Sequence, residues 1–300
     1  MASDIALSTV WAIGRFPSLA GFFNAGRELG FAQFELGFTI DSVMLKGLSL
    51  EGMITSVHEP CPADLSAAEL KRRNWLISAP DEEDRRQGVA ATRRSVELAH
   101  RVGAQAVIVH AGRVDMDPTL ESTLTNLHRA GKFDQPEYAR ARERLMAARA
   151  AQAHANMQSV RRSLIELAEV ADRLGVRLGL ENRNHYYEIP LADELDDLLD
   201  LGCGAVIGYW HDVGHAQILQ HLGLGTHEEW LRQFSSRMLG VHLHDVVGLK
   251  DHLAAGLGQV DWDMVARYVP ASALRTCEFQ SFNSPQEVAA GLKWLVDREV

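Results

Sequence analysis

The sequence predicts a single (β/α)8 TIM barrel, an α/β fold, that spans residues 1–300 and carries a long helical insertion after its fourth strand. Eight short apolar runs alternate with helical patterns along the chain, which is typical of a parallel sheet. A chain of 300 residues also has the length of a closed eight-stranded barrel. Most of the apolar runs end in a carboxylate or an imidazole, and the active site of this fold lies at the C-terminal ends of its strands.

The first half of the chain holds four of the predicted strands, at residues 5–10, 32–36, 53–57 and 106–109. The run at 106–109 is the clearest of these, because a continuous apolar, largely β-branched stretch is expected for a strand buried on both faces. Glu35, His58 and His110 stand at the ends of the last three runs. Helices are predicted at 18–29 with Ser18 as N-cap, at 42–49, and at 81–102 with Gly103 after it.

The helical insertion is predicted at about residues 113–160. Its first part, Gly112 to Gly131, is expected to be irregular or weakly helical. A capping-box pattern at 134–137 then opens a stretch to Leu174 without glycine or proline, which predicts a helix of roughly 50 Å with a kink near Asn156. The Ala- and Arg-rich first half of this helix is expected to project from the body, as a solvated face, a lid or a dimer contact.

The second half of the chain holds the other four predicted strands, at residues 176–180, 205–209, 238–241 and 273–277. They lead into Glu181, Asp212 with His215, His242 with His244, and Glu278. One side chain of the pair His242 and His244 is expected to point away from the barrel interior. Helices are predicted to begin near Pro190, at capping boxes opened by Thr226 and Ser284, and after Asp261.

Bulk properties narrow the classes of partner and compartment. The formal net charge of −10 argues against a duplex nucleic-acid partner, whose phosphates carry the same sign. Three widely spaced cysteines, Cys61, Cys203 and Cys277, argue against a disulfide framework and fit a reducing compartment. The N-terminal residues lack the pattern of a signal peptide, and every apolar run is shorter than the ~18 residues that span a bilayer. We therefore expect a cytoplasmic enzyme that does not bind membranes.

The polar residues at the strand ends predict a metal site. Carboxylates and imidazoles that converge in a barrel mouth would repel each other or lose hydration, and a divalent cation removes that conflict. Three carboxylates and an imidazole suit Mn2+, Mg2+, Co2+ or Zn2+, and additional imidazoles favour Zn2+ or Mn2+. Glu181, Asp212, His242 and Glu278 follow strands five to eight and form the strongest set. Taken singly, His58 or His110 is more often a hydrogen-bonded packing residue than a ligand, and Glu35 is more often structural, since a carboxylate can brace a neighbouring loop.

At these residues the chain resembles the xylose isomerase-like barrel superfamily, which contains the sugar phosphate isomerases and epimerases and the endonuclease IV group. The matching motifs are Leu180-Glu181-Asn182, Asp212-Val213-Gly214-His215, His242-Leu243-His244-Asp245, Asp251-His252-Leu253 with Gly256-Leu257-Gly258, and Glu278. The epimerase branch implies that Glu181, Asp212, His242 and Glu278 bind one divalent metal, and that Glu181 and Glu278 are the catalytic acid–base pair. The implied reaction is isomerisation or epimerisation of a sugar, sugar phosphate or polyol by proton transfer through a metal-bound cis-enediolate, a step of carbohydrate metabolism.

The resemblance also suggests residues that contact the substrate. Arg183, His215 and Lys250 are candidates for binding substrate oxygens or a phosphate, and Trp11 is a candidate wall for the apolar side of a sugar. The remaining candidates for this role are His58, His110 and His252. We expect a small sugar or polyol as the partner, and a homodimer is the assembly that the long helix suggests.

The endonuclease IV branch implies a different function, that of a multi-zinc phosphodiesterase that acts on abasic DNA. Its further metal ligands would be His58, His110, His215 and His252. Lys250 replaces the aspartate that this branch places two residues before His252, which weakens the third zinc site. Two more functions fit the same residues: a polyol dehydratase of this superfamily, and a metal-binding barrel without catalysis.

Overall fold

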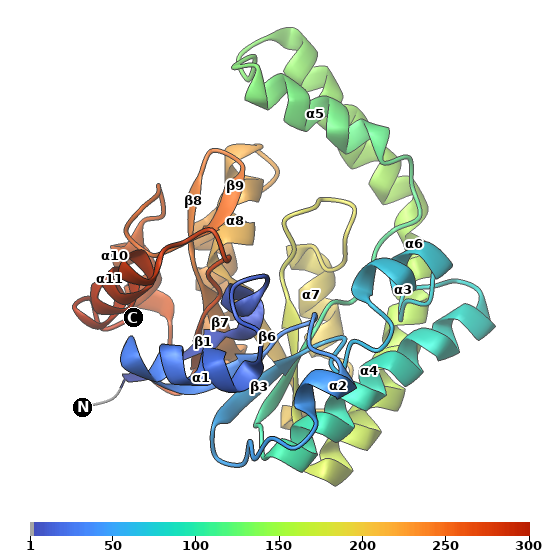
Figure 1. The fold of residues 1–300 in the computed structure, drawn as a ribbon. Helices are drawn as coiled ribbons and strands as arrows, with labels where there is room; N and C mark the ends of the chain where they lie inside the picture. Colours follow the sequence, from blue (N-terminus) through green and yellow to red (C-terminus); the bar gives the residue numbers. More distant parts are fainter. Residues whose placement is uncertain (1–2) are drawn as a thin grey trace.

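The fold is a closed parallel barrel wrapped by helices, as the sequence predicts (Figure 1). The computed structural model describes residues 3–300, so Met1 and Ala2, at the start of the segment expected to lack a signal peptide, lie outside the described residues. In residues 3–300, eight strands close in the order β1-β10-β7-β6-β5-β4-β3-β2. The barrel strands are β1 (Ser3–Ser8), β2 (Phe31–Leu36), β3 (Ile54–His58), β4 (Ala106–Val109), β5 (Arg177–Glu181), β6 (Ile207–Asp212), β7 (Met238–Leu243) and β10 (Leu274–Cys277).

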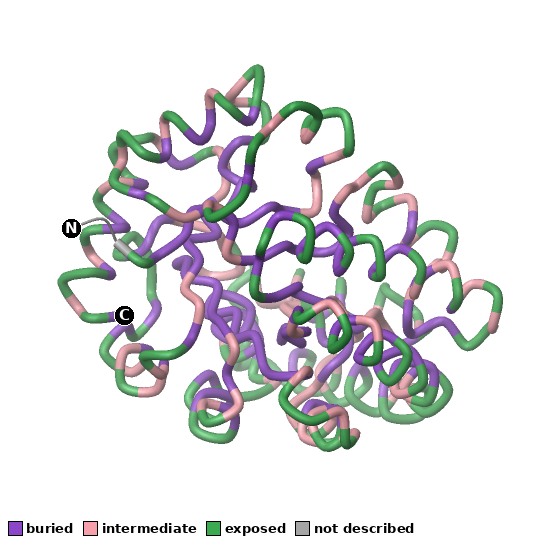
Figure 2. Tube along the Cα trace, turned by 90° about the horizontal axis from the view of Figure 1, so that it is seen from below, coloured by how far each residue is buried: buried purple, intermediate pink, exposed green. Residues whose placement is uncertain are grey.

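Helices follow the barrel strands along the chain, with the last helix after the last strand, and an antiparallel hairpin follows β7. The helices are α1 (Leu19–Glu28), α2 (Ser42–Leu45), α3 (Ala67–Arg73), α4 (Glu82–Val102), α5 (Thr119–Arg129), α6 (Pro136–Leu174), α7 (Ala192–Leu199), α8 (Val213–His221), α9 (His227–Phe234), α10 (Trp262–Tyr268) and α11 (Pro285–Val296). Short 3-10 turns are η1 (Thr9–Ala12), η2 (Gly204–Val206) and η3 (Ser235–Arg237), and β8 (Asp245–Val247) pairs with β9 (Lys250–Leu253). Buried residues concentrate in the central strands and on the inner sides of the helices (Figure 2).

Side-chain caps define several of the predicted helix ends. Ser18, Asp81 and Asp261 each accept a backbone N–H at the start of the helix that follows. The capping box opened by Ser284 is confirmed, with Glu287 as its second member. Within residues 3–300, the side chains of Gln135 and Thr226 make no capping bond, so the boxes predicted at 134–137 and 226–229 are wrong. Proline at the first helical position is sufficient to start α6 there.

Some strands end at a different residue from the one predicted, because strand pairing does not stop where the apolar run stops. β6 continues to Asp212 and β7 to Leu243, because Asp212 is paired in register with His242 although both residues are polar. The first strand ends earlier than predicted, at Ser8, whose side chain caps the turn η1. Apolar character marks burial, whereas pairing with the neighbouring strand decides where a strand ends.

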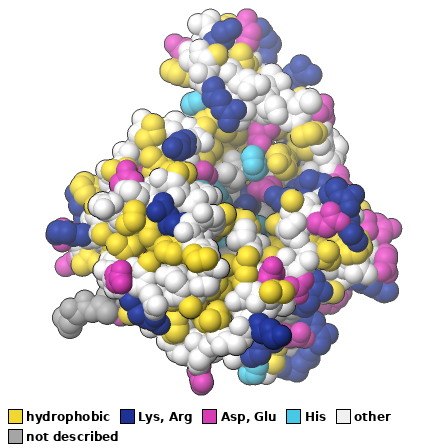
Figure 3. All heavy atoms as spheres, viewed as in Figure 1, with side chains coloured by type: hydrophobic (Ala, Val, Ile, Leu, Met, Phe, Trp, Pro, Cys, Tyr) yellow, Lys and Arg dark blue, Asp and Glu magenta, His cyan; other side chains and the backbone are white. Residues whose placement is uncertain are grey.

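The insertion is a hairpin of two helices that rises above the barrel mouth (Figure 1). The segment expected to be irregular or weakly helical contains the regular helix α5. Its residues Leu120, Leu124 and Leu127 face a small apolar cluster shared with α6 and α8. The phenol of Tyr138 in α6 donates to the carbonyl of Leu222, 3.1 Å away, which ties the hairpin to the end of α8. The hairpin therefore forms a roof over part of the mouth, and a hollow with His, Asp and Glu side chains is visible beneath it (Figure 3).

The long helix α6 is one continuous element from Pro136 to Leu174, and the kink near Asn156 stays a prediction. Asn156 faces inward, and its side chain bonds the carbonyl of Ser78 and the N–H of Asp115. Arg149, about two turns earlier and also buried, holds Glu194 through both terminal nitrogens at 2.7 Å. The Arg149 guanidinium also donates to the carbonyls of Tyr186 and Glu188. These contacts fix the loop after β5 against α6.

A tryptophan fills the barrel interior below the mouth. Trp210 lies in β6 and is fully buried. A Cβ atom at Gly240 would lie 2.3 Å from its ring, and one at Gly179 would lie 2.9 Å away, so both flanking strands need glycine at that level. The imidazole of His242 lies directly beside it, with ring centroids 5.2 Å apart. Trp210 thus forms an apolar floor under the polar mouth.

Across residues 3–300, every helix is too short or too polar to cross a bilayer.

Replacing Arg149 with methionine should destabilise the fold by about 3 kcal/mol, because Glu194 and two carbonyls would lose a buried charged partner. Urea unfolding monitored by circular dichroism measures this change. Arg144→Met is the matched control, since Arg144 lies on the exposed side of the same helix and should shift the free energy of unfolding by less than about 0.5 kcal/mol. Equal effects of the two substitutions would contradict the anchoring role of Arg149.

Candidate metal centre

Four potential ligands from neighbouring strands meet at the barrel mouth. Glu181 ends β5, Asp212 ends β6, His242 lies in β7, and Glu278 directly follows β10. One ligand atom from each lies within 4.8 Å of every other, and all four side chains are buried. The register of the parallel strands brings these residues together. Asp212 in β6 is opposite His242 in β7. On the other side of β7, Thr276 is opposite His242 and Cys277 is opposite Leu243, so Glu278 is the next residue after β10.

His242 is the centre of this group. Its Nδ1 lies 2.8 Å from Glu181 Oε1, 3.4 Å from Glu278 Oε2 and 3.6 Å from Asp212 Oδ2. Its other ring nitrogen, Nε2, lies 3.2 Å from Glu35 Oε2, which also accepts the hydroxyl of Ser56. A carboxylate on the far nitrogen fixes the ring orientation and leaves Nδ1 directed at the carboxylates, as in metal-ligating histidines.

Glu35 therefore contacts the four-residue group through His242. The sequence placed this residue near a strand end and favoured a structural role for it. The structure shows it buried, with its carboxylate directed into the barrel at His242.

The electrostatics of the four residues fit a divalent cation. Burial opposes ionisation of Glu181, but Arg183 and His110 outweigh it and hold the pKa of Glu181 well below its usual value. Burial likewise opposes ionisation of Asp212, and His215 and His244 lower its pKa. These groups are thus carboxylates at neutral pH, with little water to solvate them. Three buried carboxylates around one imidazole are a donor set that Mn2+, Mg2+, Co2+ or Zn2+ would satisfy.

The carboxylates around His242 also affect the pKa of its imidazole. Burial alone would lower the pKa of His242, but Glu278 and Glu35 raise it well above its ordinary value. A cation that binds the Nδ1 atom must displace the proton of this imidazole, so metal binding at this group would release a proton.

A second group of ligand atoms adjoins the first through Glu181. His58, His110 and Glu181 also offer atoms within 4.8 Å of one another. His110 Nε2 lies 2.9 Å from Glu181 Oε2, and Arg183 Nη1 lies 2.7 Å from His110 Nε2. The same Nη1 donates to Glu181 Oε2. Burial and the cation of Arg183 lower the pKa of His110 to about 3, so its imidazole is neutral.

His244, His252 and Glu278 form a third group on the opposite side of the site. His244 Nε2 lies 3.0 Å from Asp212 Oδ1, and His252 Nε2 lies 3.3 Å from Glu278 Oε2. The two rings stack with centroids 4.2 Å apart. The expectation that either His242 or His244 points away is wrong, because residues two apart on a strand share a face and both contact Asp212. His244 is thus a site residue that the sequence analysis did not select.

His215 reaches the site from the first turn of α8. Its backbone N–H donates to Asp212 Oδ1, and its Nδ1 lies 3.0 Å from the carbonyl of Asn182 and 3.5 Å from Asp212 Oδ2. Among the described residues, no group of ligand atoms within 4.8 Å of one another contains both His215 and His252. A third zinc site would be expected to bring these two histidines together.

Two predicted substrate contacts lie away from the centre. Trp11 is 1% exposed, packs against Phe16 and Phe22, and donates its indole N–H to the carbonyl of Asn283. This corrects the prediction that it walls the sugar, because its side chain belongs to the apolar core between η1 and α1. Lys250 is exposed on β9, with Nζ 4.1 Å from the centre of the Phe282 ring.

Buried hydrogen bonds behind Asp212 form a supporting layer that the sequence analysis also missed. The side chain of Asn182 accepts the N–H of Asp212 and donates to its carbonyl. Tyr209 donates to Asn182 and also lies 2.5 Å from His211 Nδ1, whose Nε2 meets His227. The motif Leu180-Glu181-Asn182 could have pointed to Asn182 in the sequence. The contact between His211 and His227 could not be found in this way, because it depends on how α9 packs.

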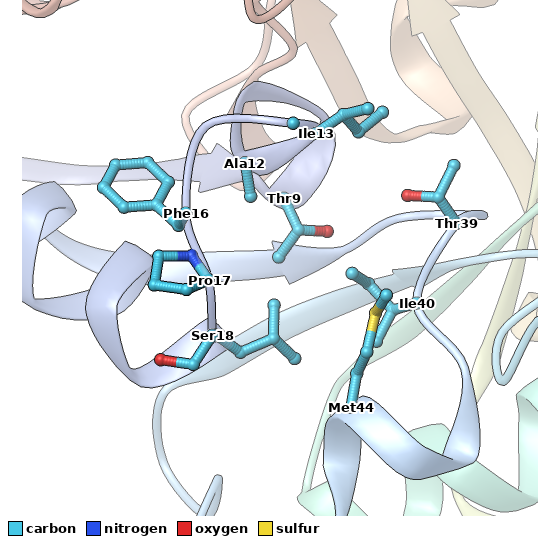
Figure 4. Close-up of a pocket in the computed structure, with 11 residues that line it drawn as sticks. Thr9, Ala12, Ile13, Phe16, Pro17, Ser18, Thr39, Ile40 and Met44 are labelled. Carbon is cyan, nitrogen blue, oxygen red and sulfur yellow. The ribbon is translucent and has the colours of Figure 1, made fainter.

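A separate pocket of about 190 Å³ opens between η1, the start of α1 and α2 (Figure 4). Its walls include Phe16, Leu19, Ile40 and Met44. Within the described chain, its lining carries no titratable side chain, so it offers apolar contact and not acid–base or metal chemistry.

Comparisons with known proteins agree on the architecture. A family model described as xylose isomerase-like TIM barrel matches residues 23–298. A curated relative, the uncharacterized protein y4fM of Sinorhizobium fredii, is 22% identical over 260 residues, which cover 84% of this chain and 72% of that protein.

Solved structures share the fold at low sequence identity. A D-tagatose 3-epimerase-like protein gives a TM-score of 0.68 at 17% identity, covering 99% of this chain and 97% of the other. The D-psicose 3-epimerase with D-tagatose from Clostridium cellulolyticum H10 gives 0.67 at 12% identity, covering 99% of both chains. The IOLI protein with a bound zinc atom gives 0.66 at 14% identity, covering 99% and 98%. At these identities the likeness establishes the fold.

Glu59 should make the stability of the metal-free protein depend on pH. Burial raises its pKa from 4.5 to about 7, although His58 and the N–H of His110 act in the opposite direction. Between these two values the unfolded chain has lost a proton that the folded chain keeps, so stability falls as pH rises. We expect Glu59→Gln to raise the free energy of unfolding at pH 8 by about 3 kcal/mol relative to wild type, and by much less at pH 4.5.

Urea unfolding at the two pH values measures the effect. Glu97→Gln is the control, because Glu97 is exposed on α4 and should leave the pH dependence unchanged. A Glu59→Gln protein with the pH profile of wild type would refute the proposed titration.

Proposed function

This chain belongs to the xylose isomerase-like TIM barrel family, and we propose that it is a divalent-metal-dependent isomerase or epimerase of a sugar, sugar phosphate or polyol. The observation that carries the proposal is the meeting of Glu181, Asp212, His242 and Glu278 at the barrel mouth. The names of two proteins with this fold, a D-tagatose 3-epimerase-like protein and a D-psicose 3-epimerase, support a sugar epimerase.

The four converging residues would hold the metal ion. Their three carboxylates and one imidazole suit Mn2+ or Zn2+ best, with Mg2+ or Co2+ as other candidates. The IOLI protein, whose structure contains a zinc atom, has the same fold. When bound, a divalent ion polarises a carbonyl and its neighbouring hydroxyl and so acidifies the C–H bond between them.

Glu181 and Glu278 would carry the proton. They come from β5 and from the end of β10, which are separated in the barrel by β6 and β7, so their carboxylates flank His242 from two sides. Burial opposes ionisation of both, but Arg183 near Glu181 and His242 near Glu278 lower their pKa values. Both are therefore carboxylates at neutral pH, and one can remove a carbon-bound proton while the other, or the same one, returns it.

Other polar groups at the mouth would bind the substrate hydroxyls. Arg183, His110 and His58 lie on the β3–β5 side of the centre, and His215 and His252 lie on the β6–β7 side. Lys250 at the exposed edge is a candidate for a phosphate or a distal oxygen. The helical hairpin above would limit access of water, and its exposed Phe133 and Met146 make it a candidate contact in a homodimer.

A multi-zinc phosphodiesterase acting on abasic DNA is the second candidate, because His58, His110 and Glu181 make a further group of potential ligands. Two features weigh against it. Lys250 replaces an acidic ligand and lies over Phe282, and the net charge of −10 opposes a DNA partner. A polyol dehydratase would use the same proton-abstracting glutamates and differs in eliminating water from its substrate.

Glutamate substitution tests the reaction. In D2O with added Mn2+, the wild-type protein should incorporate deuterium at the carbon next to the carbonyl of its sugar, as NMR detects. Glu181→Gln and Glu278→Gln should each slow the exchange by about 100-fold or more, because the carboxamide cannot accept the proton. Glu143→Gln, an exposed substitution on α6, is the control and should exchange at the wild-type rate. Undiminished exchange in both site variants would reject the assignment, and cleavage of abasic DNA without exchange would favour the phosphodiesterase.

Glu35 gives an independent test through metal affinity. Glu35→Ala removes the carboxylate that orients His242 while leaving the four proposed ligands intact. We expect Mn2+ binding to weaken by about 10- to 100-fold in calorimetric titrations. The exposed Glu28→Ala serves as the control. An unchanged dissociation constant for Glu35→Ala would show that His242 needs no such support.

A further inference from the structure

The side chain of Arg183 lies where the ligand atoms of the second group converge. Its Nη1 contacts both His110 Nε2 and Glu181 Oε2. These two acceptors lie 2.9 Å apart, so their lone pairs are directed at one nitrogen of the guanidinium. Because Nη1 can only donate, both atoms act as acceptors toward it, and the positive charge of the guanidinium offsets the repulsion between them.

The hydrogen-bond partners of His58 and His110 show which ring nitrogens of the second group can accept. His58 Nδ1 lies 3.0 Å from the carbonyl of Glu59, which can only accept, so Nδ1 donates and Nε2 is the ring nitrogen that faces Glu181. That Nε2 lies 3.9 Å from Glu181 Oε1. Arg183 Nη1 can only donate, so His110 Nε2, 2.7 Å away, accepts from it. Two imidazole nitrogens and one carboxylate are a donor set that binds Zn2+ or Mn2+ in the absence of a competing cation.

The guanidinium is held firmly in this place. Its Nε donates to Glu188 Oε2 at 3.1 Å, and the other oxygen of Glu188 accepts Lys71 Nζ at 2.9 Å. Glu188 is buried, and its carbonyl is bound by Arg149 of α6. The cation of Arg183 is thus built into the loop after β5.

Glu181 links the two groups, because its oxygens face different partners. Oε1 lies 2.8 Å from His242 Nδ1 in the four-residue centre, and Oε2 faces His110 and Arg183. A second metal ion on Oε2 would have to occupy the region of the guanidinium, where like-charge repulsion in a buried site is strong.

We propose that Arg183 supplies the positive charge that a second metal ion would otherwise bring, so that wild-type protein holds one ion and the His58–His110–Glu181 group becomes a metal site when Arg183 is removed. The inference rests on the proposed function for the metal at the four-residue centre and deepens it. A single ion with a fixed guanidinium beside it suits proton transfer on a small sugar, whereas a pair of ions bridged by Glu181 would suit phosphodiester hydrolysis.

Counting ions in matched variants tests the proposal. Protein stripped with a chelator is loaded with excess Mn2+ alone, desalted and analysed by mass spectrometry of the metal. We expect one ion per chain in wild type and in Arg183→Lys, which keeps the positive charge, and two in Arg183→Met. Adding His110→Ala to Arg183→Met should return the count to one. Electron paramagnetic resonance should change from the signal of isolated Mn2+ to that of a spin-coupled pair in Arg183→Met.

The outcomes separate this inference from the proposed function. Two ions in wild type, or one ion in a folded Arg183→Met protein, would overturn the inference and leave the epimerase to be judged by deuterium exchange. One ion in wild type and two in Arg183→Met, without exchange in any sugar, would support the inference and reject the epimerase. Circular dichroism of each variant verifies that the fold is retained.

Discussion

Buried negative charge around one imidazole governs the architecture of this barrel mouth. Glu35, Glu181, Asp212 and Glu278 are all buried and all lie within 3.6 Å of a ring nitrogen of His242. Glu181, Asp212 and Glu278 are carboxylates in this small buried volume, and such charges need cations placed among them. The polar residues around this group each offset part of its negative charge or donate hydrogen bonds to it.

The surrounding cations and donors are arranged on opposite sides of the centre. Arg183 compensates Glu181 on the β5 side and is itself held by Glu188. His244 and His252 compensate Asp212 and Glu278 on the β7 and β9 side. What remains is the space among Glu181, Asp212, His242 and Glu278, where the carboxylates face one imidazole nitrogen and a divalent ion would complete the charge balance.

The barrel supplies the rigidity that this arrangement needs. Below the centre, Trp210 fills the interior between two glycines, so the barrel is closely packed under the strand ends. Behind Asp212, Asn182 binds both polar groups of its backbone. At the side, α6 holds the loop after β5 through Arg149, so the long helix that rises above the mouth also fixes the position of Arg183 and Glu188. The insertion is therefore part of the support of the site.

The fold and the four central residues could be predicted because they follow from local patterns. Apolar runs mark strands, and in a parallel barrel every strand ends at the same rim, so Glu181, Asp212, His242 and Glu278 had to lie at one mouth. The contacts of Glu35, His244 and Arg183 could not be predicted in this way. Each depends on the direction of a side chain and on which residue from a distant strand faces it, and Trp11 shows the converse, a residue near a strand end that turns into the core.

Local patterns in the chain are enough to specify the barrel, the strand ends that carry ionisable groups and the long helix of the insertion, because periodicity acts over a few residues. The three-dimensional packing was needed to establish that α5 is a regular helix, that Glu35 supports His242, and that Arg183 lies between His110 and Glu181. The physical reason is the same in each case. These contacts join residues that are far apart in the chain, and the free energy that selects them comes from burial and charge pairing in the folded state, which no short segment contains.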